Sequence, residues 1–166
     1  MKKIIFLLSL LLSITVSTNA LTYEEAFSSI KDLPNMKGVE GYEISGNNDF
    51  AALGITDGQL ILWDGETAID KETEVYGNTI YKIMGELPVA EMVQCRIGGQ
   101  NLFAIFAKPV SADMNQILIL SDSGGAGFTG AMIGHINDRD LAALRKAILL
   151  PREGGGTAVY IDVFNF

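Results

Sequence analysis

The stretch that decides the fold is MVQCRIGGQNLFAIFAKPVSADMNQILILSDSGGAGFTGAMIGHI, residues 92–136. After Pro88 the period of the apolar residues changes from 3.6 to 2 and stays at 2 through this stretch, which is typical of β-strands. Four consecutive strands are predicted, at residues 92–97, 102–107, 117–120 and 128–136. Short Gly-rich or polar connections join them, and this order predicts an antiparallel four-strand meander.

Helical periodicity flanks the meander on both sides. It predicts three helices, at about residues 23–33, 71–87 and 138–149. The first starts with a capping box, in which Thr22 is followed three residues later by Glu25. Each of the three runs ends just before a proline, which cannot continue a helix.

Further strands are expected outside the meander. GVEGYEIS (38–45) and AVYIDVF (158–164) are predicted strands, and residues 60–63 form a short one between the turn dipeptides Asp57-Gly58 and Asp64-Gly65. Helices that interrupt an antiparallel sheet indicate an α+β fold. We therefore expect one α+β domain, with the meander 92–136 and flanking strands in one sheet.

The first twenty residues, MKKIIFLLSLLLSITVSTNA, have the pattern of a secretory signal peptide. Two lysines precede an apolar run, and Thr18 and Ala20 place small residues at the −3 and −1 positions of a cleavage site. The run is shorter than the roughly 20 residues that span a bilayer. The sequence thus predicts a signal peptide at 1–20 and an exported, soluble domain at 21–166, located in the periplasm or outside the cell.

Charge and cysteine content limit the partners. The net charge is −8, and removal of the two lysines of the signal peptide would make it −10. Such a charge disfavours nucleic acid and anionic membrane surfaces, whereas cationic or neutral partners fit better. Cys95 is the only cysteine, so an internal disulfide is impossible. Its alternation with Val93 and Ile97 predicts a buried thiol on one strand face; intermolecular pairing or nucleophilic chemistry is the alternative.

A Gly-rich motif, GAGFTG (125–130), matches the G-x-G-x-x-G pattern of dinucleotide-binding loops. Two features argue against that function. Gly134 interrupts the segment that would have to be a helix, and few residues follow for the rest of a nucleotide-binding fold. The motif is better interpreted as a hairpin connection over residues 121–130, and no cofactor is expected.

His135 is the only histidine, so any Ser-His-Asp or Cys-His arrangement has to use it. The candidate nucleophiles are Ser121, Ser123 and Cys95, and the candidate orienting carboxylates are Asp138 and Asp140. None stands at a diagnostic spacing. We expect His135 at a strand end facing solvent, and no catalytic residue is assigned.

Two other features suggest ligand sites. Acidic residues crowd segment 47–74, but without the spacing of a calcium loop, so a solvated acidic face is the better interpretation and cation binding stays open. Trp63, the only tryptophan, lies at a predicted strand end. There it is either part of the core or an exposed platform for a sugar or peptide. A zinc site is not expected, because one Cys and one His cannot complete a tetrahedral shell.

Segment 87–144 also carries a family resemblance. LPVAEMVQCRIGGQNLFAIFAKP, NQILILSDSGG and FTGAMIGHINDRDLAAL follow in this order, preceded by NMKGVEGYEIS at 35–45. This order resembles a family of small exported proteins of Bacteroides-type bacteria, known only as a domain of unknown function. The resemblance implies an opening helix, a central helix, the meander, and a Gly-x-Ile-x-x-x-x-Leu entry to the last helix. That family has no known activity, so the resemblance transfers no functional residue.

Together these observations predict an exported binding or accessory module of the cell envelope without a catalytic apparatus. The ligand would be a protein, a peptide or a glycan. Two other classes remain open. One is a small hydrolase or transferase that uses His135, and the other is a structural subunit of an envelope complex, which would show an exposed apolar patch.

Overall fold

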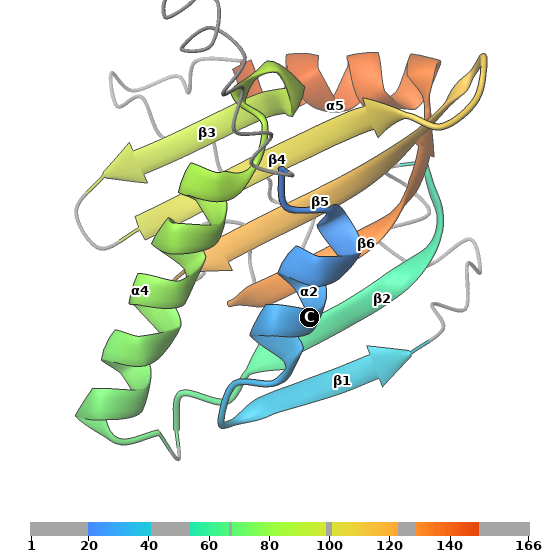
Figure 1. Cartoon of the computed structure of the whole chain (residues 1–166). Helices are drawn as coiled ribbons and strands as arrows, with labels where there is room; N and C mark the ends of the chain where they lie inside the picture. Colours follow the sequence, from blue (N-terminus) through green and yellow to red (C-terminus); the bar gives the residue numbers. More distant parts are fainter. Residues whose placement is uncertain (1–19, 41–53, 67, 99–100, 123–128, 150–166) are drawn as a thin grey trace, which may run out of the picture.

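The computed structural model of the chain describes residues 20–40, 54–66, 68–98, 101–122 and 129–149. Within these ranges it contains one antiparallel sheet, three α-helices and a short 3-10 helix (Figure 1). In chain order, the elements are α2 (Tyr23–Lys31), β1 (Met36–Glu40), β2 (Ile55–Trp63), α4 (Asp70–Glu86), η1 (Val89–Glu91), β3 (Met92–Gly98), β4 (Asn101–Pro109), β5 (Met114–Asp122), β6 (Gly130–Asn137) and α5 (Asp138–Leu149).

The strands form a six-stranded sheet with the order β1-β2-β6-β5-β4-β3. Strands β3 to β6 are neighbours in chain order and pair antiparallel, so they form the predicted meander. Strand β2 then pairs with β6, and β1 pairs with β2. The α+β class, the three helices and the antiparallel sheet predicted from the sequence are therefore confirmed.

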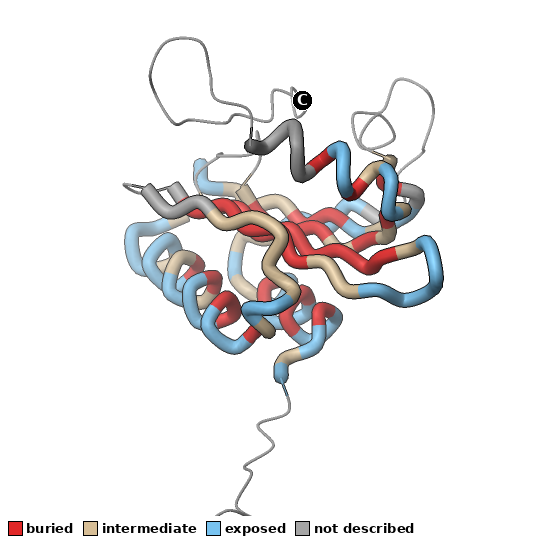
Figure 2. The backbone as a smooth tube through the Cα atoms, turned by 90° about the horizontal axis from the view of Figure 1, so that it is seen from above, coloured by how far each residue is buried: buried red, intermediate tan, exposed pale blue. Residues whose placement is uncertain are grey.

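The helices cover both faces of the sheet. Figure 2 shows α2 and α4 on one face and α5 on the other. Each face has its own apolar cluster, because successive residues of a strand point to opposite faces. The cluster between the sheet and helices α2 and α4 includes Tyr76, Ile80, Phe106 and Leu118. The cluster between the sheet and α5 includes Phe103, Ile105, Ile117 and Met132.

Local chemistry explains where the helices begin. The Thr22 hydroxyl accepts a hydrogen bond from the Glu25 backbone N–H, and the Glu25 carboxylate accepts one from the Thr22 N–H, which completes the predicted capping box of α2. Similarly, the Asn137 side chain accepts a hydrogen bond from the Asp140 N–H at the start of α5. Each cap satisfies a backbone donor that has no partner within its helix.

The predicted turn before residues 60–63 was wrong. Asp57-Gly58 is not a turn but lies within β2, where Asp57 pairs with His135 and Gly58 with Gly134. A register irregularity between Ile55 and Asp57 lets this polar dipeptide enter the ladder. Strand β1 covers residues 36–40, and the remainder of the predicted strand 38–45 lies outside the described residues, as does all of 158–164.

The predicted face of Cys95 also requires a correction. The register of β3 against β4 shifts between Met92 and Gln94, which is the mark of a β-bulge and turns side chains over locally. As a result, Val93 packs against the cluster under α5, whereas Cys95 packs against the cluster under α2 and α4. Cys95 is half-buried rather than fully buried, and its burial raises the pKa of the thiol.

Candidate functional site

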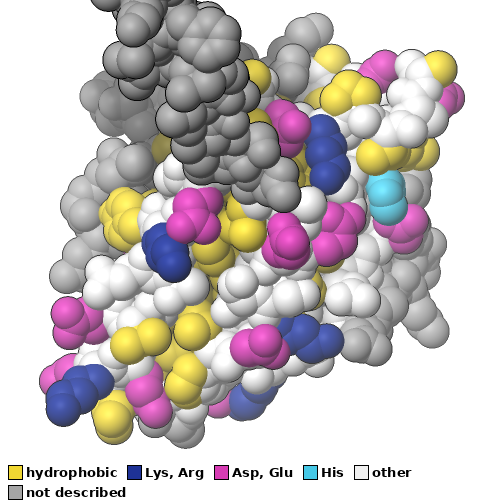
Figure 3. All heavy atoms as spheres, in the orientation of Figure 1, with side chains coloured by type: hydrophobic (Ala, Val, Ile, Leu, Met, Phe, Trp, Pro, Cys, Tyr) yellow, Lys and Arg dark blue, Asp and Glu magenta, His cyan; other side chains and the backbone are white. Residues whose placement is uncertain are grey.

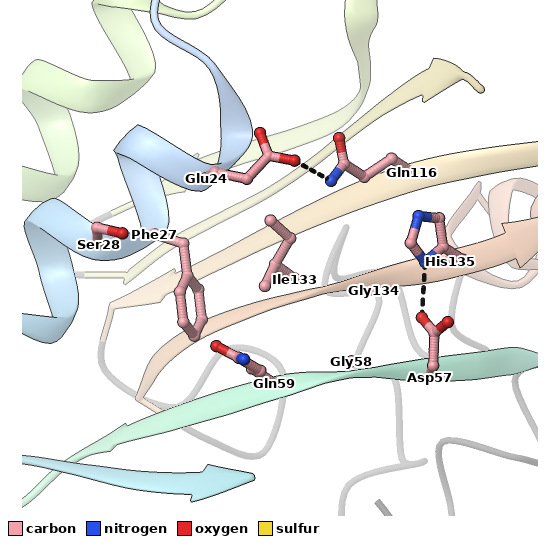
Figure 4. Close-up of a pocket in the computed structure, with 10 residues that line it drawn as sticks. All are labelled: Glu24, Phe27, Ser28, Asp57, Gly58, Gln59, Gln116, Ile133, Gly134 and His135. Atoms are coloured by element: carbon pink, nitrogen blue, oxygen red, sulfur yellow. Dashed lines mark hydrogen bonds and ion pairs between the residues drawn. The ribbon is translucent and has the colours of Figure 1, made fainter. Parts of the chain in front are cut away.

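An open groove of about 360 Å³ lies between α2 and the strands beneath it (Figure 4). Its volume is at the small end of the range of ligand pockets. The lining residues come from α2, β2, β5 and β6 and are Glu24, Phe27, Ser28, Asp57, Gly58, Gln59, Gln116, Ile133, Gly134 and His135. Segments far apart in the sequence therefore build one site.

The floor of the groove consists of two rows of residues that run across the strands. In the first row, Asp57, His135 and Gln116 are direct neighbours on β2, β6 and β5. In the second row, two positions further along β6, Ile133 has Gln59 as its neighbour on β2. The rows are roughly 7 Å apart, as the rise of an extended strand requires. One end of the groove is thus polar, whereas Ile133 and the Phe27 ring above it give the middle of the groove an apolar surface (Figure 4).

His135 and Asp57 form a hydrogen-bonded pair at the polar end. The distance between His135 Nδ1 and Asp57 Oδ1 is 2.7 Å. An ionised carboxylate only accepts hydrogen bonds, so Nδ1 carries the hydrogen and donates the hydrogen bond to Asp57. The side chains are 37% and 63% exposed, respectively, which places the pair at the solvent-facing rim of the groove.

Glu24 reaches into the same end of the groove from α2. Its Oε1 accepts a hydrogen bond from Gln116 Nε2 at 2.5 Å. This bond lowers the pKa of Glu24, and the nearby charges of Lys108 and His135 lower it further. The Lys108 ammonium lies 4.5 Å from the centre of the Tyr23 ring and is not part of the lining. Glu24 is therefore held as a carboxylate at neutral pH.

The groove carries negative charge. Its lining contains the two carboxylates Glu24 and Asp57 and the imidazole of His135, but neither lysine nor arginine. Figure 3 shows the histidine on this face of the molecule with acidic side chains beside it. The overall charge of −8 has the same sign, so the field at the groove favours neutral or cationic ligands.

The candidate nucleophiles do not lie near His135. Ser121 pairs with Gly130, five residues from His135 along β6, a separation of roughly 17 Å. Cys95 is on β3, with β4 and β5 between it and β6, which amounts to roughly 14 Å across the sheet. Ser123 lies outside the described residues.

The candidate orienting carboxylates Asp138 and Asp140 lie in the first turn of α5 and bind asparagine side chains instead of His135. Asp138 accepts a hydrogen bond from the Asn115 side chain at 2.6 Å, and Asp140 accepts one from Asn137 at 2.7 Å. The carboxylate that does hold His135 is Asp57, which sequence reasoning treated as a turn residue. Ser28 lines the groove as well, but Figure 4 shows it at the opposite end from His135.

Trp63 lies away from this groove and packs against another aromatic ring. Its ring stacks on Tyr76 with a centroid distance of 4.7 Å, and the Tyr76 hydroxyl donates a hydrogen bond to the Ser121 carbonyl at 2.6 Å. One face of the indole is therefore covered by the Tyr76 ring. This arrangement favours a structural role for Trp63 over a ligand platform.

The acidic residues of segment 47–74 that the structure describes are dispersed. Asp64 pairs with Lys37, and Glu72 accepts hydrogen bonds from the Asn35 side chain and the Ile69 N–H. Among the described residues, no three His, Cys, Asp or Glu side chains gather in a group that could hold a metal ion.

The Gly-rich motif 125–130 is followed by a strand. Strands β5 and β6 pair from Met114 with Asn137 to Ser121 with Gly130, so the chain between them joins two antiparallel neighbours. Gly130 starts β6, whereas a phosphate-binding loop of this type leads into a helix. Residues 123–128 themselves lie outside the described part.

The comparisons with known proteins identify no relative: no protein-family model, curated protein or solved structure matches the chain. The resemblance to the Bacteroides-type family stays a prediction from the sequence. In the ranges that the structure describes, no helix has the length and apolar character needed to cross a membrane.

Proposed function

We propose that the protein is exported and acts outside the inner membrane as a binding or accessory module. The groove between α2 and the sheet is the ligand site in this proposal, and a peptide or a glycan is the ligand. The observation that carries it is the composition of the groove. It joins the apolar side chains of Ile133 and Phe27 to a row of polar side chains, and sites for small ligands combine apolar surface with polar groups that fix the orientation of the ligand.

Catalysis through His135 is the second candidate, because His135, Asp57 and Ser28 line one groove. Nucleophilic catalysis requires the serine hydroxyl within hydrogen-bond reach of the imidazole. Figure 4 places Ser28 and His135 at opposite ends, with Phe27 and Ile133 between them. The groove therefore supports binding better than acyl or group transfer.

A structural role in an envelope complex has less support. Such a role calls for a contiguous apolar patch on the surface. The large apolar side chains that are exposed among the described residues are spread over β1, α4 and its N-cap, η1 and the β4–β5 turn, and they are Val39, Ile69, Val75, Tyr81, Val89 and Val110.

Export is tested by the N-terminus of the protein that the cell produces. Because Thr18 and Ala20 provide the small residues of the cleavage site, N-terminal sequencing of the protein recovered from the periplasm or the medium should start at Leu21. Recovery from the cytoplasm with Met1 intact would contradict export.

The groove is tested with arrays of short peptides and glycans. Gln59 is exposed on β2 at the groove, so a Gln59→Trp variant should fill the groove while the strand tolerates the aromatic side chain. We expect the wild-type exported protein to bind a subset of the arrayed compounds and Gln59→Trp to lose those signals.

The matched control is Glu74→Trp, which adds the same side chain at an exposed position of α4, outside the groove lining. It should keep the binding pattern of the wild type. Binding that survives Gln59→Trp unchanged, or an absence of binding to either array, would refute the proposed site.

A further inference from the structure

The groove has an apolar surface in its middle and a negatively charged end, and this polarity constrains its ligand. Ile133 and Phe27 provide the apolar surface, while Glu24 and Asp57 provide the charge at the other end. The row of Asp57, His135 and Gln116 crosses three adjacent strands, which corresponds to roughly 10 Å. An elongated group with an aliphatic stem and a polar head matches this layout.

The sign of the charge selects among such groups. Both carboxylates accept a hydrogen bond within the groove: Gln116 donates to Glu24, and His135 donates to Asp57. No lysine or arginine lines the groove, and the charge of Lys108 reaches Glu24 only from outside the lining. Each carboxylate has further acceptor sites, because an ionised carboxylate offers about four lone-pair positions.

We propose that the groove binds a basic side chain, arginine or lysine, of a peptide segment. This inference rests on the proposed function and specifies its ligand. The aliphatic stem of the side chain lies on Ile133 and Phe27, and its cationic head lies at the polar end of the groove, where the carboxylates of Glu24 and Asp57 attract it. Long basic side chains commonly bury their stem on apolar surface while the charged head meets carboxylates.

The test compares two blocked peptides that differ in one charge: acetyl-Ala-Arg-Ala-amide and the same peptide with citrulline in place of arginine. Citrulline has nearly the shape of arginine but is neutral. Binding of each peptide to the exported protein is measured by calorimetric titration. We expect the arginine peptide to bind roughly tenfold more tightly, as two partly exposed charge pairs allow. The preference should shrink when the salt concentration is raised about tenfold.

Two substitutions test whether the preference for arginine comes from Glu24 and Asp57. In Glu24→Gln and Asp57→Asn, the amide oxygens still accept from Gln116 and His135, so the charge is lost while the local hydrogen bonds are kept. The double variant should bind both peptides equally weakly. The control Glu74→Gln removes one charge from α4, away from the groove lining, and should retain the preference for arginine.

The outcomes separate this inference from the proposed function. If the two peptides bind equally, and Gln59→Trp abolishes both, the ligand is a neutral peptide and the inference is wrong although the groove binds. An arginine preference that survives in the double variant would also overturn the inference. If neither peptide binds, a basic side chain is not the ligand, and the array experiment alone decides whether the groove binds another compound.

Discussion

Gly130→Ala is expected to lower the free energy of unfolding more than most single substitutions do. Gly130 starts β6 with φ +150°, and a Cβ built there would lie 1.9 Å from the Ile61 carbonyl oxygen. That atom belongs to the backbone of β2 and cannot rotate away, so the ladder between β2 and β6 must shift. We expect a loss of about 3 kcal/mol or more in the free energy of unfolding. Urea denaturation followed by circular dichroism measures this loss.

The matched control is Gly85→Ala, in the last turn of α4. A Cβ at Gly85 has no neighbouring atom within 4 Å, and alanine favours a helix over glycine by about 0.5 to 1 kcal/mol. This variant should be slightly more stable than the wild type. If Gly130→Ala and Gly85→Ala had similar stability, the close pairing of β2 and β6 would be refuted.

Phe106→Ala is expected to have an effect of the same size for a different reason. Phe106 lies in the middle of β4, is completely buried, and packs in the cluster under α2 and α4. Its removal leaves a cavity that the surrounding sheet and helices cannot fill. Such substitutions cost about 3 to 5 kcal/mol, a large part of the roughly 5 to 15 kcal/mol that stabilises a domain.

Val110→Ala is the control for Phe106→Ala. Val110 lies just after β4 and is 51% exposed, so its truncation should change the free energy of unfolding by less than about 0.5 kcal/mol. The two variants are compared by their midpoints of thermal or urea unfolding. A midpoint for Phe106→Ala as high as that for Val110→Ala would mean that the apolar cluster under α2 and α4 does not hold the fold together.

The elements that were predicted correctly are those whose signals are local. The capping box at Thr22 indicated the start of the first helix, and the short apolar runs 102–107 and 117–120 identified the central strands. Both strands are buried on both faces of the sheet, so tertiary packing agrees with their continuous apolar sequence.

The errors arose where a neighbouring strand decides the structure. Asp-Gly favours a turn in isolation, but pairing with β6 draws Asp57-Gly58 into β2. The bulge at Val93 depends on the register between β3 and β4. Neither effect leaves a pattern within the segment itself, so sequence periodicity alone does not reveal it.

The groove was missed for the same reason. His135 and Asp57 are 78 positions apart in the chain, and Gln116 and Glu24 are 92 apart. No polar–apolar alternation marks Asp57 as a strand residue, although Asp57, Gln59, Ile61 and Trp63 share one face of β2. The pairing of that face with His135 on β6, however, follows only from the strand order.

The measurement that tests the binding site most directly is the mapping of amide chemical shifts in the ¹⁵N-labelled protein. The titrant is the compound with the strongest array signal. We predict that the largest shift changes occur at Phe27 and Ser28 on α2, Gln59 on β2 and Ile133 on β6, which line the groove. Amides at the distant edge strand β3, such as Cys95, should change little. The largest changes on β3 or α5, with the groove amides unaffected, would contradict the assignment of the groove as the ligand site.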